Sequence, residues 1–415
     1  MTSEWKEYKL KDVCIKITDG SHYSPKATEL GYPMLSVKDM QEFGFSYTNC
    51  KYITEQDFVK MQQNDCVPLE NDILVAKDGS YLKHIFICKK NKQEAILSSI
   101  ALFRPNTKII NPNFLCYLLK SPNIYNYIKL NCVSGSALPR IILKDFKNIT
   151  IGIPPLETQQ KIAKVLSAID DKIELNNSIN NNLEQQAQAI FKSWFIDNEY
   201  EIEKETVIGE VCKCELGGTP SRNKKEYWDG SIAWINSGTV NNYRITKATE
   251  YITELGLSKS ATKLLPQKTT VLAITGATLG QISLLEIDSC ANQSVVGILE
   301  NEKVPYEFIY PYICHNIHEL LSHQTGGAQQ HINKQNIEQL AISLPKHDVI
   351  CKYKKYVNPI YSKITNNCFE NEQLAQLRDT LLPKLMSGEI DVSKVEIDNI
   401  LENQSADKLL FSEDK

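Results

Sequence analysis

The sequence predicts an α+β protein with two globular domains separated by two long helices. Two stretches carry apolar residues at helical spacing over many turns, and a repeat of about 190 residues contains both of them. A narrow apolar stripe cannot be buried by one helix alone, so each helix needs the other as its partner. We therefore expect an antiparallel coiled coil and an internal pseudo-two-fold repeat.

The first helix is expected over residues 162–194. Pro154-Pro155 mark its start, and neither glycine nor proline interrupts it. A polar step at Asn176 divides its apolar stripe into two parts. The stripe consists of Ile162, Leu166, Ile169, Ile173, Ile179, Leu183, Ala187, Ile190 and Trp194.

The partner helix follows from the repeat. The segment SGSALPRI (134–141) returns as TGGAQQHI (325–332), 191 residues later, and the same offset aligns the first helix with residues 348–386. Pro359 lies inside this second helix, where a proline removes a hydrogen bond and favours a kink. The second stripe consists of Ile350, Tyr353, Val357, Ile360, Ile364, Leu374, Leu377, Leu381 and Leu385.

Apolar residues also lie beside the two stripes. Phe191, Phe195 and Leu382 are off the expected seam, so they could dock a partner.

Each repeat unit is a globular part followed by a helix. Short β-rich runs such as ILVA (73–76) and TVLAIT (270–275), separated by turn residues, predict the globular parts. We expect domains at 1–153 and 199–344, helices at 154–198 and 345–390, and an acidic tail at 391–415.

Composition excludes several classes of protein. No run of 18 apolar residues predicts a membrane span, and the charged N-terminus is unlike a signal peptide. The 12 cysteines form no CxxC pair, so we expect a reduced cytoplasmic chain without a metal site. The net charge of −4 is unevenly distributed: residues 1–153 carry +5, whereas residues 199–344 carry −5.

The expected topology matches the symmetry of duplex DNA. The first helix leads from domain one to domain two, and the second can return along it without a long connection. About 36 helical residues span roughly 54 Å, which is about one and a half turns of B-DNA. The predicted target is therefore two short half-sites separated by an unread gap.

Four segments give the chain a resemblance to a known family. They are IPPLETQQKI (153–162), AIDDKI (168–173), SWF (193–195) and LLPKLMSGEI (381–390). The chain resembles the specificity (S) subunits of type I restriction–modification systems over nearly its whole length.

The resemblance implies a different function for each type of subunit in a complex. Each globular domain would be a target recognition domain for one half of a split sequence in double-stranded DNA. The coiled coil would dock methyltransferase (M) subunits, of which we expect two. These would methylate adenine N6 with S-adenosylmethionine, and restriction (R) subunits would use ATP and Mg²⁺. No catalytic residue, cofactor or membrane partner is expected in this chain.

Two motifs could be mistaken for catalytic ones. Asn111-Pro112-Asn113-Phe114 resembles the loop of an adenine methyltransferase, but a capped helix start explains it better. The turn from Gly276 to Gly280 lacks the residues of a nucleotide-binding loop, although its glycines would let the backbone approach a phosphate.

Polar loops at corresponding places in the two domains are the candidates for DNA contact. Arg140 can pair with guanine, and glutamine suits adenine. The full set is Lys38, Lys77, Lys83, His84, Ser134 and Arg140 in domain one, and Asn236, Ser237, Thr278, Gln281, Gln329, Gln330 and His331 in domain two. A symmetric protein-interaction scaffold that does not read DNA remains the alternative.

Overall fold

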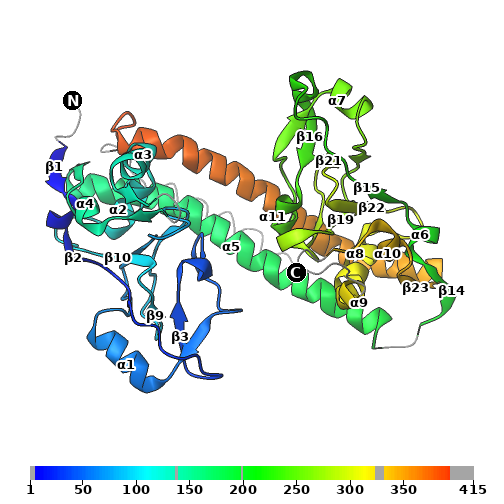
Figure 1. Cartoon of the computed structure of the whole chain (residues 1–415), viewed down its shortest axis with the longest axis horizontal. Helices are drawn as coiled ribbons and strands as arrows, with labels where there is room; N and C mark the ends of the chain where they lie inside the picture. The colour runs from blue at the N-terminus through cyan, green and yellow to red at the C-terminus, as the bar shows by residue number, and fades with distance from the viewer. Residues whose placement is uncertain (1–4, 136–138, 198–199, 323–330, 393–415) are drawn as a thin grey trace, which may run out of the picture. The chain divides into compact units, whose positions relative to one another are not determined.

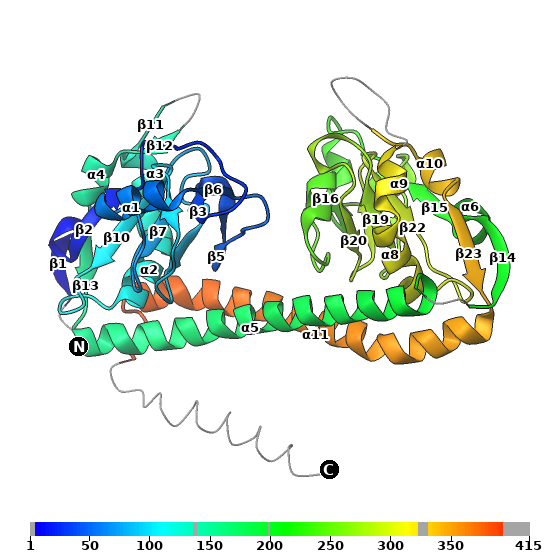
Figure 2. The same ribbon diagram turned by 90° about the horizontal axis from the view of Figure 1, so that it is seen from below.

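The computed structural model describes residues 5–135, 139–197, 200–322 and 331–392 (Figures 1 and 2). The chain forms two compact units. Unit one contains Met1–Glu174 and Leu374–Lys415, and unit two contains Leu175–Gln373. Each unit thus holds one globular domain with half of each long helix. This grouping differs from the expected linear division, because each domain packs on the helix segments beside it.

Domain one, the globular part of unit one, is built on the antiparallel sheet β2-β10-β7-β8. A second sheet has the order β6-β3-β9, and strand pairs β1-β13, β4-β5 and β11-β12 complete the domain. The strands are β1 (Lys6–Lys9), β2 (Cys14–Asp19), β3 (Tyr32–Leu35), β4 (Met40–Gln41), β5 (Gly44–Phe45), β6 (Lys51–Ile53), β7 (Ile73–Ala76), β8 (Ile85–Ile87), β9 (Ala95–Ile96), β10 (Ile100–Pro105), β11 (Val133–Ser134), β12 (Arg140–Ile141) and β13 (Thr150–Ile153). The helices are η1 (Leu10–Asp12), η2 (Val37–Asp39), α1 (Glu55–Gln63), α2 (Pro112–Lys120), α3 (Pro122–Asn131) and α4 (Leu143–Lys147).

Both faces of the main sheet are buried, because successive side chains along its strands enter two different cores. Ile73 and Val75 of β7 belong to the core formed with α2, α4 and the long helices, whereas Leu74 and Ala76 belong to a core on the opposite face. Because both faces are covered, the strand reads as a continuous apolar run. Domain one is therefore held to the helices by its own central sheet.

Domain two, the globular part of unit two, repeats this plan. Its antiparallel sheet β15-β22-β19-β20 corresponds to β2-β10-β7-β8, and the sheet β17-β16-β21-β18 corresponds to β6-β3-β9 with one added strand. The strands are β14 (Ile202–Val207), β15 (Cys214–Leu216), β16 (Trp228–Ile235), β17 (Glu250–Ile252), β18 (Leu264–Leu265), β19 (Thr270–Ala273), β20 (Ile282–Leu284), β21 (Ser289–Ala291), β22 (Val295–Ile298) and β23 (Ala341–Pro345). The helices are α6 (Ile208–Val211), η3 (Lys225–Tyr227), η4 (Ser237–Asn241), α7 (Glu254–Ser258), η5 (Gly276–Thr278), α8 (Tyr306–His315), α9 (Ile317–Ser322) and α10 (Lys334–Glu338). The predicted internal repeat is confirmed by this common strand order.

The two long helices are α5 (Leu156–Phe195) and α11 (His347–Met386). In unit one, Arg378 Nη1 of α11 lies 2.8 Å from Asp170 Oδ1 of α5. In unit two, Asn176 of α5 bonds to Asn371 of α11 and Asn180 bonds to Asn367. Residue numbers rise along α5 as they fall along α11, so the helices pair antiparallel within each unit (Figure 2). The α11 helix runs unbroken through Pro359, so the proline does not end it.

Most residues of the predicted seam are buried or half-buried. Leu183, Ile190, Trp194 and Ile360 are half-buried against the core of unit two, and Leu381 is half-buried against the core of unit one. Leu374 is also half-buried. Only Leu377 is largely exposed, at 49%. The fully buried members are Ile162, Leu166, Ile169, Ile173 and Ala187 on α5, and Ile350, Tyr353, Val357, Ile364 and Leu385 on α11.

The expectation that Phe191, Phe195 and Leu382 dock a partner is wrong. Their side chains are 2%, 6% and 7% exposed, respectively. Phe191 and Phe195 pack on Phe308 of α8, and Leu382 lies in the core of unit one. The helices bury a wider face than a two-helix seam requires, because each domain covers them as well.

A layer of asparagines replaces apolar residues in the helix pair of unit two. Asn176, Asn180 and Asn367 are 1%, 2% and 1% exposed. Asn176 Nδ2 donates to Asn371 Oδ1 at 2.9 Å and to Glu370 Oε2 at 2.9 Å, and Asn367 Nδ2 donates to Asn180 Oδ1 at 2.8 Å. The Oδ1 atoms of Asn176 and Asn367 are buried and accept no hydrogen bond. Such a layer costs stability and favours one register.

None of the helices in the described ranges has the length and apolar character needed to cross a membrane.

The asparagine layer yields a prediction about stability. Asn180→Leu alone leaves the Asn367 amide without its acceptor and should lower the free energy of unfolding by about 1–3 kcal/mol. Asn180→Leu combined with Asn367→Leu removes both polar partners and should recover that loss. Urea denaturation measures both effects, with the exposed Gln185→Leu as the control. A double variant less stable than Asn180→Leu alone would contradict this account.

Candidate nucleic-acid interface

The candidate segments of domain one meet at one edge. Strand β7 ends at Ala76, and the next three residues run beside the β11–β12 hairpin. Ile141 N donates to Lys77 O at 3.0 Å, Gly79 N donates to Pro139 O at 2.9 Å, and Asp78 forms a β-bridge with Arg140. Two segments that lie some 60 residues apart in the sequence are therefore joined by their backbones.

Domain two forms the same edge. Strand β19 ends at Ala273, Ile332 N donates to Ile274 O at 3.1 Å, and Thr275 forms a β-bridge with His331. Thr275 and His331 occupy the places of Asp78 and Arg140. The structure thus brings together, in each domain, two candidate segments that lie far apart in the sequence.

Further backbone bonds repeat around this edge. Lys77 N donates to Ser99 O at 2.9 Å, and Ile274 N donates to Ser294 O at 2.9 Å. Ala76 N donates to His84 O and Ala273 N donates to Gln281 O, both at 2.9 Å, so His84 and Gln281 are equivalent in position. One backbone frame therefore carries different side chains in the two domains.

The side chains of domain one differ in how available they are. Arg140, Lys38 and Lys83 are exposed, and Ser134 is half-buried opposite Arg140 in the hairpin. Lys77 is only 7% exposed, and its Nζ lies 2.7 Å from Asp19 Oδ2 and 3.7 Å from Asp78 Oδ1. Lys77 therefore holds the edge together rather than presenting a free ammonium group.

In domain two, several candidate side chains have local partners. Asn236 Oδ1 accepts from Thr239 N at 3.2 Å and caps η4, and the Thr278 hydroxyl donates to Thr275 O at 3.4 Å. Ser237 is half-buried beside this cap, whereas Gln281 and His331 are exposed. Gln329 and Gln330 lie outside the described residues.

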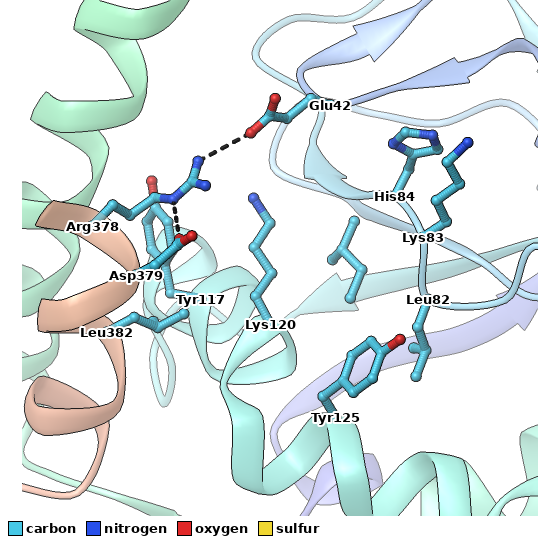
Figure 3. Close-up of a pocket in the computed structure, with 11 residues that line it drawn as sticks. Glu42, Leu82, Lys83, His84, Tyr117, Lys120, Tyr125, Arg378, Asp379 and Leu382 are labelled. Atoms are coloured by element: carbon cyan, nitrogen blue, oxygen red, sulfur yellow. Dashed lines mark hydrogen bonds and ion pairs between the residues drawn. The ribbon is translucent and has the colours of Figure 1, made fainter. Parts of the chain in front are cut away.

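A pocket of about 360 Å³ lies between domain one and the α11 segment of unit one (Figure 3). Lys83 and His84 are on one side of it, and Lys120 and Arg378 are on the other. Arg378 is held by Asp170, Glu42 and Asp379 at 2.8, 3.0 and 3.0 Å, which neutralises its charge. Burial, and then the neighbouring Lys83, lower the pKa of His84. The imidazole is therefore neutral near pH 7 and can both donate and accept a hydrogen bond.

The two motifs that resemble catalytic loops serve local structure. Asn111 Oδ1 accepts from Phe114 N at 3.0 Å and caps α2. Gly276 and Gly280 have φ values of +69° and +84°, which side chains rarely adopt. The expected capped helix start and glycine turn are confirmed.

The sequence left several residues of this edge unassigned. Ser99 and Ser294 accept the backbone bonds that pin it, and Asp19 holds Lys77. Their matching positions in the two repeats could have marked them as part of this edge. The bonds could not be predicted, because they join strands that are distant in the sequence.

Comparisons with known proteins agree on one family. The model described as "Type I restriction modification DNA specificity domain" matches residues 2–185 and 202–372. The specificity subunit of the type I restriction enzyme HindI from Haemophilus influenzae is 25% identical, with 94% of this chain and 100% of that protein covered. The MjaIX specificity subunit from Methanocaldococcus jannaschii is 26% identical, with 94% and 95% covered.

A solved structure shows the same fold. The crystal structure of a type I restriction–modification system S subunit from M. genitalium superposes with a TM-score of 0.53 at 18% identity. It covers 92% of this chain and 96% of that one.

The capping role of Asn111 predicts that its substitution lowers stability, which a purely catalytic role would not. Asn111→Ala should lower the free energy of unfolding by about 1 kcal/mol, because Phe114 N loses its acceptor. Asn111→Asp keeps an acceptor and should lose less. Urea denaturation of the two variants measures the difference, and equal losses would contradict the capping role.

Proposed function

Because this chain belongs to the family of type I restriction–modification specificity subunits, we propose that each of its domains reads one half of a bipartite sequence in double-stranded DNA. The chain would have no catalytic residue and no cofactor of its own. Partner methyltransferase subunits would supply S-adenosylmethionine chemistry at adenine N6, and restriction subunits would supply ATP- and Mg²⁺-dependent cleavage.

The repeated edge is the observation that carries this proposal. The bridges Asp78–Arg140 and Thr275–His331 place equivalent loops in equivalent positions, but the side chains on them differ. Arg140 presents a guanidinium that can bond to both guanine O6 and N7. Gln281 presents an amide that can bond to adenine N6 and N7. A common frame with different side chains is what two unlike half-sites require.

The candidate residues with buried or occupied groups take supporting roles in this proposal. Lys77 stabilises the edge through Asp19, and Asn236 shapes the turn that it caps. Direct contacts are proposed for the exposed candidates, whether or not they also have a partner within the chain. They are Lys38, Lys83, Arg140, Gln281 and His331.

The long helices are proposed to set the gap between half-sites and to dock two methyltransferase subunits. Each contains 40 residues, which corresponds to about 60 Å of helix. Buried polar contacts tie each domain to them. In unit one the Tyr117 hydroxyl of α2 donates to Asp170 of α5 at 2.7 Å, and in unit two Arg244 Nη2 lies 2.7 Å from Glu184 Oε2 of α5. A domain that cannot turn on its helix would hold its reading edge at a defined angle.

Two single substitutions test the reading role. In a complex with its methyltransferase subunits, Arg140→Ala should change or relax one base pair of one half-site, with a loss of about 1–3 kcal/mol in discrimination. Gln281→Ala should change the other half-site only. Sequencing of methylated adenines in a randomised plasmid library measures both. Val59→Ala, which changes a 41% exposed residue of α1, is the control and should change neither half.

Three outcomes would count against the proposal. If Arg140→Ala altered both half-sites, the two domains would not read independently. If neither substitution altered either half, the repeated edge would not be the reading surface. A complex that assembles but neither binds nor methylates DNA would favour the protein-interaction scaffold.

A further inference from the structure

A second exposed segment lies at the edge of domain one that carries Arg140. It follows Asp19, the last residue of β2, and its backbone is pinned on both sides. Gly20 N donates to Ile100 O at 3.1 Å, Ser21 N donates to Ile96 O at 2.8 Å, and Ser98 N donates back to Ser21 O at 2.9 Å. The segment therefore has a fixed path before it leaves the sheet.

Glycine makes this close approach possible in both domains. A Cβ on Gly20 would lie 2.3 Å from Ile96 O, and one on Gly217 would lie 2.1 Å from Asn292 O. Gly217 N and Gly218 N donate to Val295 O at 3.0 Å and to Ala291 O at 2.8 Å, as Gly20 and Ser21 do in domain one. Any other residue would push the segment away from the edge.

The two residues after this anchor are presented to solvent. The His22 side chain is 77% exposed and Tyr23 is 63% exposed. Tyr23 N donates to Ser21 Oγ at 3.1 Å, and the same hydroxyl donates to Tyr23 O at 2.8 Å. The backbone is thus ordered, while the imidazole and the phenol ring are largely exposed. A backbone that is already ordered loses little conformational entropy when it binds.

Side-chain contacts of Asp19 connect this segment to the rest of the edge. Asp19 Oδ2 lies 2.7 Å from Lys77 Nζ, and Asp19 Oδ1 lies 3.4 Å from His22 Nε2. Lys77 in turn accepts from Ile141 N through its backbone carbonyl, next to Arg140. His22 and Arg140 are therefore attached to one rigid frame.

We infer that His22 and Tyr23 form a second base-reading element of domain one, beside the base pair that Arg140 contacts. The imidazole can donate to the N7 or O6 acceptors of a purine, and the phenol ring can contact a thymine methyl group while its hydroxyl bonds to a base edge. The inference rests on the proposed DNA-reading function. The inferred reading surface then includes a segment that lies about 118 residues before Arg140 in the sequence.

Domain two supports the inference by contrast. Thr219 and Pro220 follow the equivalent glycines there. The Thr219 hydroxyl donates to Gln293 Oε1 at 2.6 Å, so a threonine and an exposed glutamine stand where domain one has His22 and Ser98. The backbone path is the same in the two domains but the side chains on it differ, as they do at Arg140 and His331.

The test uses the full-length chain in complex with its methyltransferase subunits. His22→Ala and Tyr23→Ala are each assayed on a plasmid library randomised at both half-sites, and methylated adenines are sequenced. We expect an approximately ten-fold loss of discrimination at one or two positions of half-site one. Half-site two and the position governed by Arg140 should keep their preferences. Val59→Ala, which changes a 41% exposed residue of α1, is the matched control.

The remaining outcomes separate this inference from the proposal beneath it. If His22→Ala and Tyr23→Ala leave every position of half-site one unchanged while Arg140→Ala alters one, the inference is overturned and the proposed function stands. A uniform drop in methylation across all sequences also overturns it, because that pattern marks a backbone contact. If the unsubstituted complex methylates no split sequence, the proposed function itself fails.

Discussion

The amide layer between α5 and α11 is the constraint on which the helix pair depends. Apolar side chains at helical spacing pack almost equally well after a slide of one turn, because dispersion and burial have no direction. The bond from Asn367 Nδ2 to Asn180 Oδ1 has a direction and a length of 2.8 Å, and Asn176 bonds to Asn371 and Glu370 at 2.9 Å. Any slide would leave these buried amides without partners. The layer thus lowers the stability of the helix pair but disfavours every register except one.

Buried polar contacts extend this constraint from the helices to the domains. In unit one, Asp170 of α5 accepts from Arg378 of α11 and from the Tyr117 hydroxyl of α2 at 2.7 Å. Burial, and then the charge of Asp170, raise the pKa of Tyr117 and keep it a donor. In unit two, Arg244 bonds to Glu184 of α5 and to the Tyr310 hydroxyl of α8 at 3.1 Å. If domain two moved, Glu184 would lose its ion-pair partner Arg244, which costs several kcal/mol. If domain one moved, Asp170 would keep Arg378 but would lose the hydrogen bond from Tyr117. Each domain is therefore held in a defined position on the helix segments of its own unit.

Much of this organisation could be predicted from the sequence, because it is periodic or repeated. The helices follow from apolar spacing, and the paired loops follow from the offset between 134–141 and 325–332. The rest depends on tertiary contacts that a single sequence does not show. Lys77 is basic and next to a turn, yet its partner Asp19 lies 58 residues earlier in the chain. Phe191 and Phe195 read as outward-facing on a two-helix seam, but α8 of domain two covers that face. The sequence shows Asn176 only as a polar gap in a stripe, whereas its bonds identify it as part of the register.

A paired insertion tests the central claim, that the helix pair with its single register sets the distance between half-sites. Seven residues are added to α5 after Glu174 and seven to α11 before Leu374, at the boundary between the two units, so that the asparagine layer and the contacts of each domain are kept. Two helical turns add roughly 10 Å, which equals about three base pairs of DNA. Sequencing of methylated adenines should show both half-sites unchanged and the gap between them longer by about three base pairs. An unchanged gap with full methylation would contradict the account.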